Sequence, residues 1–190
     1  MNADDFGNLI ADTAMRFDGA CACGPYRQRI FDAVGMPFDP EPFHVVNGKV
    51  HGISTCYVFA RHVLDLCGVD LPAWHIGEPI GTLIAWARRV GCWQVPGDGL
   101  APDRGDVLII GPRGGTHVCV VDDIALDPSG DGMVWTIDGG QVCRRTTDGH
   151  DGTGRQLIAV RKRVWCGSSV VGVQRDPVVG WVVAGLAPMR

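Results

Sequence analysis

No run of apolar residues in this chain of 190 residues is long enough to cross a lipid bilayer. The most apolar C-terminal run, residues 178–189, is shorter than the roughly 20 residues that a spanning helix needs. A secretory signal is also missing, because Asp4 and Asp5 stand where such a signal carries positive charge. We therefore expect no membrane insertion and no Sec-dependent export, and we predict synthesis in the cytoplasm.

Basic charge is scarce. The chain has 17 lysines and arginines against 21 acidic residues, which gives a net charge of −4 and a pI near 5.8. Such a chain has no general attraction for phosphate backbones or anionic lipid, so we expect no nucleic-acid partner. The short basic run Arg161-Lys162-Arg163 is predicted to form the solvated face of a strand.

The spacing of a structural zinc site is missing as well. No pair of cysteines is spaced C-x-x-C, and Cys21-x-Cys23 has no second pair in the sequence to complete a ligand set. His150 stands in a turn-like segment, 148–154, that we expect to be a solvated loop. We therefore expect no metal and no cofactor, and predict that most of the eight cysteines are reduced and buried: Cys21, Cys23, Cys56, Cys67, Cys92, Cys119, Cys143 and Cys166.

The patterns that are present predict helices first and strands afterwards. Helical spacing covers 3–17, a helix beginning near Thr55 and closed by Gly68, and about 80–90, with a possible short helix at 26–34 inside an otherwise ordered loop, 18–52. Short β-branched runs then predict strands at 107–110, 117–121, 133–137, 157–160 and 178–183. This order predicts an α+β fold in one domain, 1–190, with an N-terminal helix and loop region (1–52) and a catalytic core (53–190).

Cys56 stands at the start of the predicted central helix. The unpaired N–H groups and partial positive charge of a helix N-terminus lower the pKa of a thiol, and a thiolate is the nucleophile. The backbone N–H of Cys56 could also face an oxyanion. Cys56 is therefore the candidate nucleophile.

A nucleophilic cysteine needs a base, and position selects among the six histidines. His62 is six residues along the helix from Cys56, too far to reach the sulfur. His117 opens a predicted strand and is the candidate base. Asp138, at the end of the next strand, is the candidate that holds its tautomer, with Gln141 in reserve.

The segments "STCYVFARHVLDLCGVDLP", "APDRGDVLII", "GTHVCVVDDI" and "VWTIDGGQ" follow one another in this order. Together they resemble the papain-like cell-wall cysteine hydrolases of the NlpC-type and CHAP families, over about residues 50–141. The resemblance implies a papain-like fold, with N-terminal helices packed on a C-terminal antiparallel sheet. It also implies a Cys56-His117-Asp138 triad that cleaves an amide bond in peptidoglycan, in the stem peptide or between peptide and sugar.

Other interpretations stay open. The same fold could act on a protein as a protease, deamidase or acyltransferase toxin, blocked by an immunity protein, or could be a catalytically silent module. For the peptidoglycan hydrolase, the missing Sec signal implies delivery to the bacterial cell wall by a phage-type or secretion-system route. Residues 127–138 fit the spacing of a calcium loop, but their β-like flanks favour a hairpin turn. Candidates for a side chain that completes the oxyanion hole are Tyr26, Asn47, His51 and Ser54.

Overall fold

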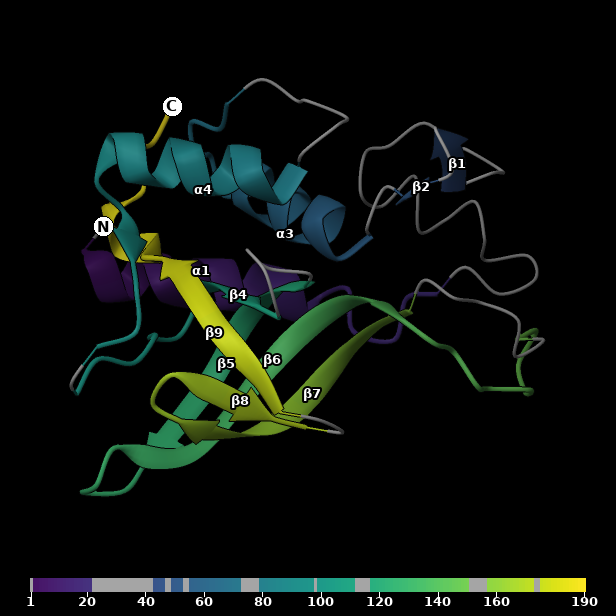
Figure 1. Ribbon diagram of the computed structural model, residues 1–190. Coiled ribbons are helices and arrows are strands. Elements are labelled where there is room, and N and C mark those ends of the chain that lie inside the picture. The colour runs from purple at the N-terminus through teal and green to yellow at the C-terminus, as the bar shows by residue number, and fades with distance from the viewer. Residues whose placement is uncertain are drawn as a thin grey trace.

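The computed structural model describes residues 2–21, 43–46, 49–52, 55–72, 79–97, 99–111, 117–150, 157–172 and 175–190. Figure 1 shows the helices that these residues form: α1 (Ala3–Met15), α3 (Thr55–Leu66), α4 (Pro79–Val90) and the 3-10 turn η2 (Ala184–Leu186). The strands are β1 (Phe43–Val46), β2 (Lys49–Gly52), β3 (Trp93–Gln94), β4 (Val107–Ile110), β5 (His117–Leu126), β6 (Asp131–Gln141), β7 (Leu157–Cys166), β8 (Ser169–Val171) and β9 (Arg175–Val182).

The main sheet closes on itself. Within the described ranges, its antiparallel strands follow the order β9-β4-β5-β6-β7-β8, and β8 pairs back onto β9 through Ser169↔Pro177 and Val171↔Arg175. The result is a six-stranded antiparallel barrel, with β3 added beside β9. The expected papain-like α+β fold, with helices packed on an open sheet, is therefore wrong. The strand that closes the barrel is only three residues long, too short for its sequence pattern to stand out.

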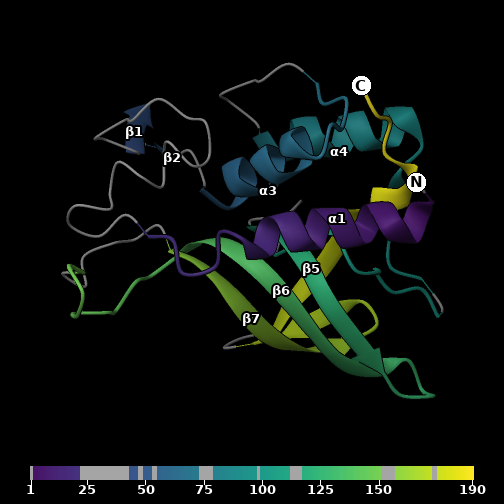
Figure 2. The ribbon, with the colours of Figure 1, turned by 180° about the vertical axis from the view of Figure 1, so that it is seen from behind.

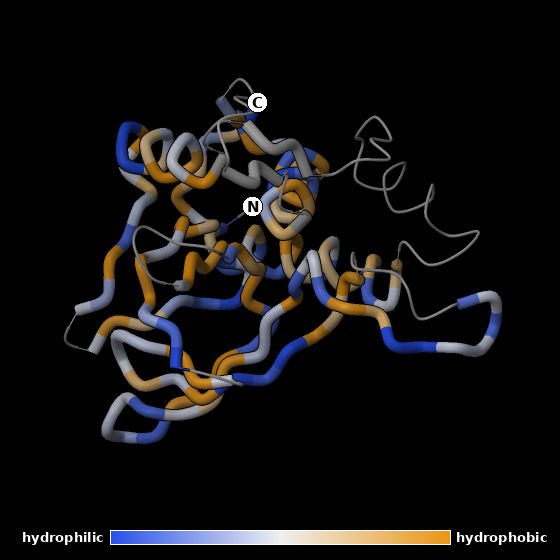
Figure 3. Tube along the Cα trace, turned by 45° about the vertical axis from the view of Figure 1, so that its right-hand side comes forward, coloured by the Kyte–Doolittle hydropathy of each residue, from blue (hydrophilic) through white to orange (hydrophobic). Residues whose placement is uncertain are grey.

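Side chains are buried on both faces of the barrel wall, in the lumen on one face and under the helices on the other. Residues that point inward pack in the lumen, where Trp165 and Trp181 meet edge to face with ring centroids 6.2 Å apart. Alternate residues such as Ile109, Val120 and Ile137 point outward and join the apolar core under the helices. Successive side chains of a strand point to opposite faces, so β4 is buried along its whole length. Apolar residues along the strands are visible in Figure 3.

The helices cover one side of the barrel. Figures 1 and 2 show α1 lying along the barrel wall, with α3 and α4 on the same side of the barrel. Asn2 and Asp5 form a capping box that satisfies the first amides of α1. In α3, Val58, Phe59 and Val63 are at most 2% exposed. The apolar face of α3 therefore packs against β5 and β6 and fixes the helix over the barrel.

Most of the predicted elements within the described ranges are confirmed. The helix predicted at 80–90 is α4, the strand at 107–110 is β4, and Gly68 ends α3 in the left-handed region with φ +81°. The expected hairpin turn joins β5 and β6 at residues 127–130, while Asp131 and Gly132 already belong to β6. The pattern missed β3 and β8, and the predicted loop 18–52 contains the hairpin β1–β2. The short helix at 26–34 lies outside the described residues.

None of the helices in the described ranges combines the length and the apolarity needed to span a bilayer.

Two glycines let α1 approach the turn before β4. A Cβ on Gly7 would overlap the carbonyl oxygen of Arg104, and a Cβ on Gly105 would overlap the backbone of Gly7. Gly105 also has φ +89°, which side chains rarely adopt. The guanidinium of Arg104 reaches across to Asp12 at 2.9 Å and holds α1 at this contact.

We predict that Gly7→Ala destabilises the protein, although alanine favours an isolated helix by about 1 kcal/mol. The clash with the Arg104 carbonyl should lower the free energy of unfolding by about 1–3 kcal/mol, the usual cost of overpacking. Urea denaturation measures it. The control is Gly97→Ala, in an exposed loop at a glycine without positive φ, which should change stability little. A Gly7→Ala protein as stable as the wild type would contradict the close contact.

Candidate functional site

The carboxylate of Asp138 lies inside the barrel and is fully buried. Its Oδ2 accepts a hydrogen bond from His117 Nε2 at 2.6 Å and one from Arg163 Nη2 at 2.5 Å. Its Oδ1 accepts from the Thr136 hydroxyl at 2.5 Å and from Arg163 Nη1 at 3.1 Å. Neighbouring strands β5, β6 and β7 supply these groups, so strand register brings them together.

The charges of this cluster stabilise one another. Burial alone would raise the pKa of Asp138, but the His117 hydrogen bond and the Arg163 guanidinium outweigh it and lower the pKa to about 2. Burial alone would lower the pKa of His117, but hydrogen bonds with Asp138 and Cys56 raise it to about 9. The imidazolium form of His117 is therefore favoured at neutral pH beside an ionised Asp138.

Cys56 completes the arrangement from the helical side. It is the second residue of α3, and its side chain hydrogen-bonds His117. The structure thus brings the predicted nucleophile, base and orienting residue together, although 60 residues of chain separate Cys56 from the base.

The cysteine itself is 2% exposed. It stands in the first turn of α3, where amide N–H groups have no acceptor within the helix and favour a negative sulfur. His62, rejected on the sequence because of its distance, packs against Phe17 with ring centroids 5.6 Å apart. Chemistry at Cys56 therefore requires that a substrate reach a sulfur that is largely covered.

The reserve residues fall in different places. Gln141 accepts a hydrogen bond from Arg161 Nε at 3.0 Å, whereas Asp138 is the residue that meets His117. Of the oxyanion-hole candidates, Tyr26, Asn47 and Ser54 lie outside the described residues. His51 belongs to β2.

Arg163 is a member of the cluster that the sequence analysis did not predict. The prediction of a solvated basic strand face holds for Lys162, which is exposed with its Nζ 5.2 Å from the centroid of the Trp135 ring. It is wrong for Arg163, whose side chain is only 12% exposed and binds Asp138. Strand periodicity could have shown this, because Arg163 shares the inward face of β7 with buried Trp165.

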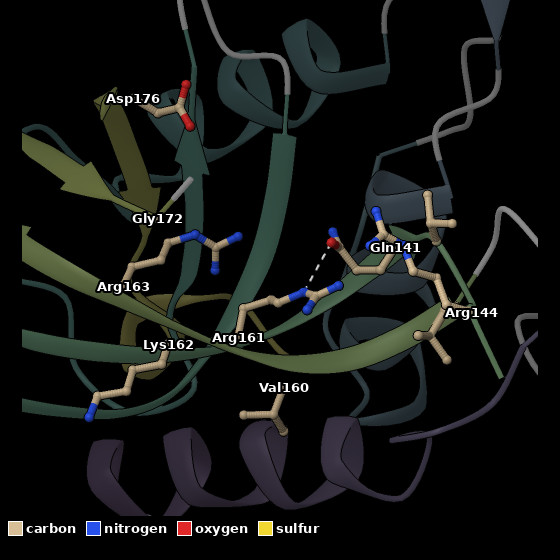
Figure 4. A pocket seen from close by; sticks show the side chains of 10 residues that line it. Gln141, Arg144, Val160, Arg161, Lys162, Arg163, Gly172 and Asp176 are labelled. Carbon is tan, nitrogen blue, oxygen red and sulfur yellow. Dashed lines mark hydrogen bonds between the residues drawn. The ribbon is translucent and has the colours of Figure 1, made fainter. Parts of the chain in front are cut away.

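A groove of about 850 Å³ lies beside this cluster. Figure 4 shows Arg161 and Arg163 pointing into it from β7, while Lys162 points away. Arg144 adds another guanidinium to its lining, and Asp176 supplies an acidic group. Because Arg163 both lines the groove and binds Asp138, a basic surface extends to the third member of the cluster.

Among the residues that the structure describes, two groups of side chains have the donor types of a metal site. In the first, His117, Cys119 and Asp138 place their donor atoms within 4.8 Å of one another. This set suits a metal poorly, because the Arg163 cation already binds both oxygens of Asp138 and burial strongly raises the pKa of the Cys119 thiol. The second group is Cys21, Cys143 and His150.

No protein family, no curated protein and no solved structure matches this chain.

We predict that Asp138→Asn lowers the free energy of unfolding by about 3–5 kcal/mol near neutral pH, because it leaves the Arg163 cation buried without its partner. Urea denaturation across pH measures this loss. Asp131→Asn, an exposed position on the same strand, is the matched control. Equal losses in both variants would contradict the buried pair.

The free energy of unfolding should depend on pH through Asp138 and His117. The folded-state pKa of Asp138 is lowered to about 2, so its stabilisation is present above the unfolded value near 4 and is lost as pH falls from about 4 to 2. The folded-state pKa of His117 is raised to about 9, so its contribution is full below about 6.5 and is lost as pH rises to 9. Asp138→Asn should flatten both limbs of the stability profile.

We also predict that His117 activates Cys56 toward alkylation. At pH 6.5, iodoacetamide should modify Cys56 about tenfold faster in the wild type than in His117→Ala, because the imidazolium stabilises the thiolate. The difference should shrink above pH 9, where a thiol ionises without help. Peptide mass spectrometry locates the adduct, and Cys56→Ser is the blank. Identical pH–rate profiles would mean that His117 does not activate the sulfur.

Proposed function

We propose that the protein is a cysteine hydrolase that cleaves an amide bond, with Cys56 as nucleophile, His117 as general base and acid, and Asp138 as the residue that orients His117. The observation that carries the proposal is the position of His117, which is hydrogen-bonded to a buried carboxylate and to a cysteine at a helix start. A nucleophile joined to a base, which is oriented in turn by a third group, is the arrangement that acyl transfer needs.

The first half-reaction forms an acyl-enzyme. The Cys56 thiolate attacks the amide carbonyl carbon, and the electron pair of the C=O bond moves to oxygen. In this mechanism the backbone N–H of Cys56, a residue in the first turn of α3, donates to that oxyanion. When the intermediate collapses, the C–N bond breaks, His117 gives its proton to the departing amine, and a thioester remains.

The second half-reaction releases the acid. Neutral His117 accepts a proton from water as the water oxygen attacks the thioester carbon. The C–S bond then breaks and returns a thiolate beside an imidazolium. Asp138 keeps its charge throughout, because Arg163 and Thr136 hold its carboxylate inside the barrel.

The groove favours a substrate that carries carboxylates. Arg144 and Arg161 line it, and guanidinium groups bind carboxylates in bidentate geometry, whereas the guanidinium of Arg163 is already bonded to Asp138. Stem peptides of peptidoglycan are short and rich in carboxylates, which agrees with the resemblance in the sequence. We therefore propose peptidoglycan stem peptides as substrate, reached after delivery to the bacterial cell wall.

A second candidate function is a binding module without catalysis. The observation in its favour is the burial of Cys56, which exposes 2% of its surface. In this case the Asp138 cluster stabilises the barrel interior, and the basic groove binds an acidic ligand that is not cleaved. Chemistry at Cys56 distinguishes the two functions.

We predict that the wild type releases soluble fragments from purified peptidoglycan and that Cys56→Ser abolishes the release, because an alcohol is not ionised by His117 at neutral pH. Turbidity measures the loss of polymer, and mass spectrometry identifies the bond that is cut. Cys166→Ser, at the partly exposed end of β7, is the matched control and should remain active.

The outcomes separate the candidates. Cleavage that persists in Cys56→Ser excludes this nucleophile. Intact peptidoglycan, together with Cys56-dependent cleavage of an acidic peptide library, keeps the hydrolase and replaces the substrate. No cleavage of either material, combined with a Cys56 that resists alkylation, supports the binding module.

A further inference from the structure

A second cysteine and histidine cluster lies away from the Asp138 site. Cys21 follows α1, Cys143 follows β6, and His150 lies in the connection between β6 and β7. Cys21 Sγ is 3.0 Å from His150 Nδ1, and Cys143 Sγ is 3.7 Å from the same nitrogen. All three donor atoms lie within 4.8 Å of one another. Residues more than 120 positions apart in sequence therefore converge on one point.

These separations fit coordination of one metal ion. Zinc binds thiolate sulfur at about 2.3 Å and imidazole nitrogen at about 2.0–2.1 Å with tetrahedral angles, which places a sulfur about 3.5 Å from a nitrogen and about 3.8 Å from another sulfur. The observed distances bracket the first value, and the 4.8 Å limit includes the second. A small displacement of side chains would seat the ion.

Backbone hydrogen bonds hold the segments that carry the three donors. Gly19 N donates to Ile158 O at 2.9 Å, and Ile158 N donates to Ala20 O at 2.8 Å, so the residues before Cys21 pair with the start of β7. Asp148 has φ +56°, and His150 N donates to Thr147 O at 3.0 Å, which turns the loop back toward Cys143. The donors are thus presented by two segments, the one that ends at Cys21 and the loop from Cys143 to His150.

The two cysteines of this cluster are buried, whereas side chains that meet by chance at the surface would be exposed. Cys143 is 0% exposed and Cys21 is 3% exposed, and together with Leu157 they form a small apolar cluster of their own. The two sulfur atoms are not joined in a disulfide. Two sulfurs and one imidazole as donors favour a thiophilic divalent ion over an oxygen-preferring ion such as Mg²⁺.

We propose that Cys21, Cys143 and His150 bind one zinc ion. Binding forms two Zn–S bonds and one Zn–N bond and releases two protons from the thiols, which leaves a site of zero net charge with a neutral imidazole. A water molecule completes the tetrahedron. The ion would link the segment after α1 to the loop between β6 and β7. The sequence analysis expected a solvated loop without a metal at His150.

Metal analysis of the purified full-length chain tests the proposal. Mass spectrometry of the metal content should find about one zinc per chain in the wild type, and Cys143→Ser and His150→Ala should each lose at least about nine tenths of it, since a ligand is removed. Cys166→Ser is the control for loss of a cysteine and should keep its zinc. Cys119→Ser tests the rival group beside Asp138 and should also keep it.

A measurement on the wild type alone covers the case in which a variant fails to fold. Protein stripped with a chelator should regain one equivalent of Co²⁺, with thiolate-to-cobalt charge transfer and the intense visible bands of tetrahedral coordination. Bound metal should also protect Cys21 and Cys143 from alkylation, located by peptide mass spectrometry. Wild type that takes up no zinc or cobalt, or zinc that is lost in Cys119→Ser but kept in Cys143→Ser, would overturn the proposal.

Discussion

The buried carboxylate of Asp138 is the constraint on which the candidate site depends. An ionised group with no exposure to solvent costs several kcal/mol unless it is fully paired. Here Arg163, Thr136 and His117 supply donors to both of its oxygens. Because these partners come from β5, β6 and β7, the same charge that orients His117 also penalises any slip in the register of those strands.

Barrel closure and helix packing place the two halves of the site. His117 and Asp138 belong to the barrel, whose inward face is filled by Trp165, Trp181 and their neighbours. Cys56 belongs to α3, whose apolar face packs against the outer face of β5 and β6. The distance between nucleophile and base therefore depends on hydrophobic packing between two layers, while the orientation of the base depends on hydrogen bonds within one.

The two histidines with cysteine neighbours differ in what surrounds them. His117 has a carboxylate on one ring nitrogen and one thiol as its other partner, which suits movement of a proton between sulfur and substrate. His150 has two thiols on the same nitrogen, which suits a shared metal ion. The same residue types thus support different chemistry, because a carboxylate stabilises an imidazolium whereas a second sulfur completes a ligand set.

The sequence by itself determined the local elements and the residue types of the candidate site. Capping residues and helical spacing predicted α1, α3 and α4, β-branched runs predicted most barrel strands, and chain order selected Cys56, His117 and Asp138. These signals are local, because helix and strand periods act over a few residues. Only the tertiary structure decided that the sheet closes through Ser169–Val171, that Arg163 turns inward to Asp138, and that Cys21 meets Cys143 and His150. Each of these depends on pairing between distant segments, and pairing of that kind is set by the packing of the whole chain and not by the pattern within any one stretch of it.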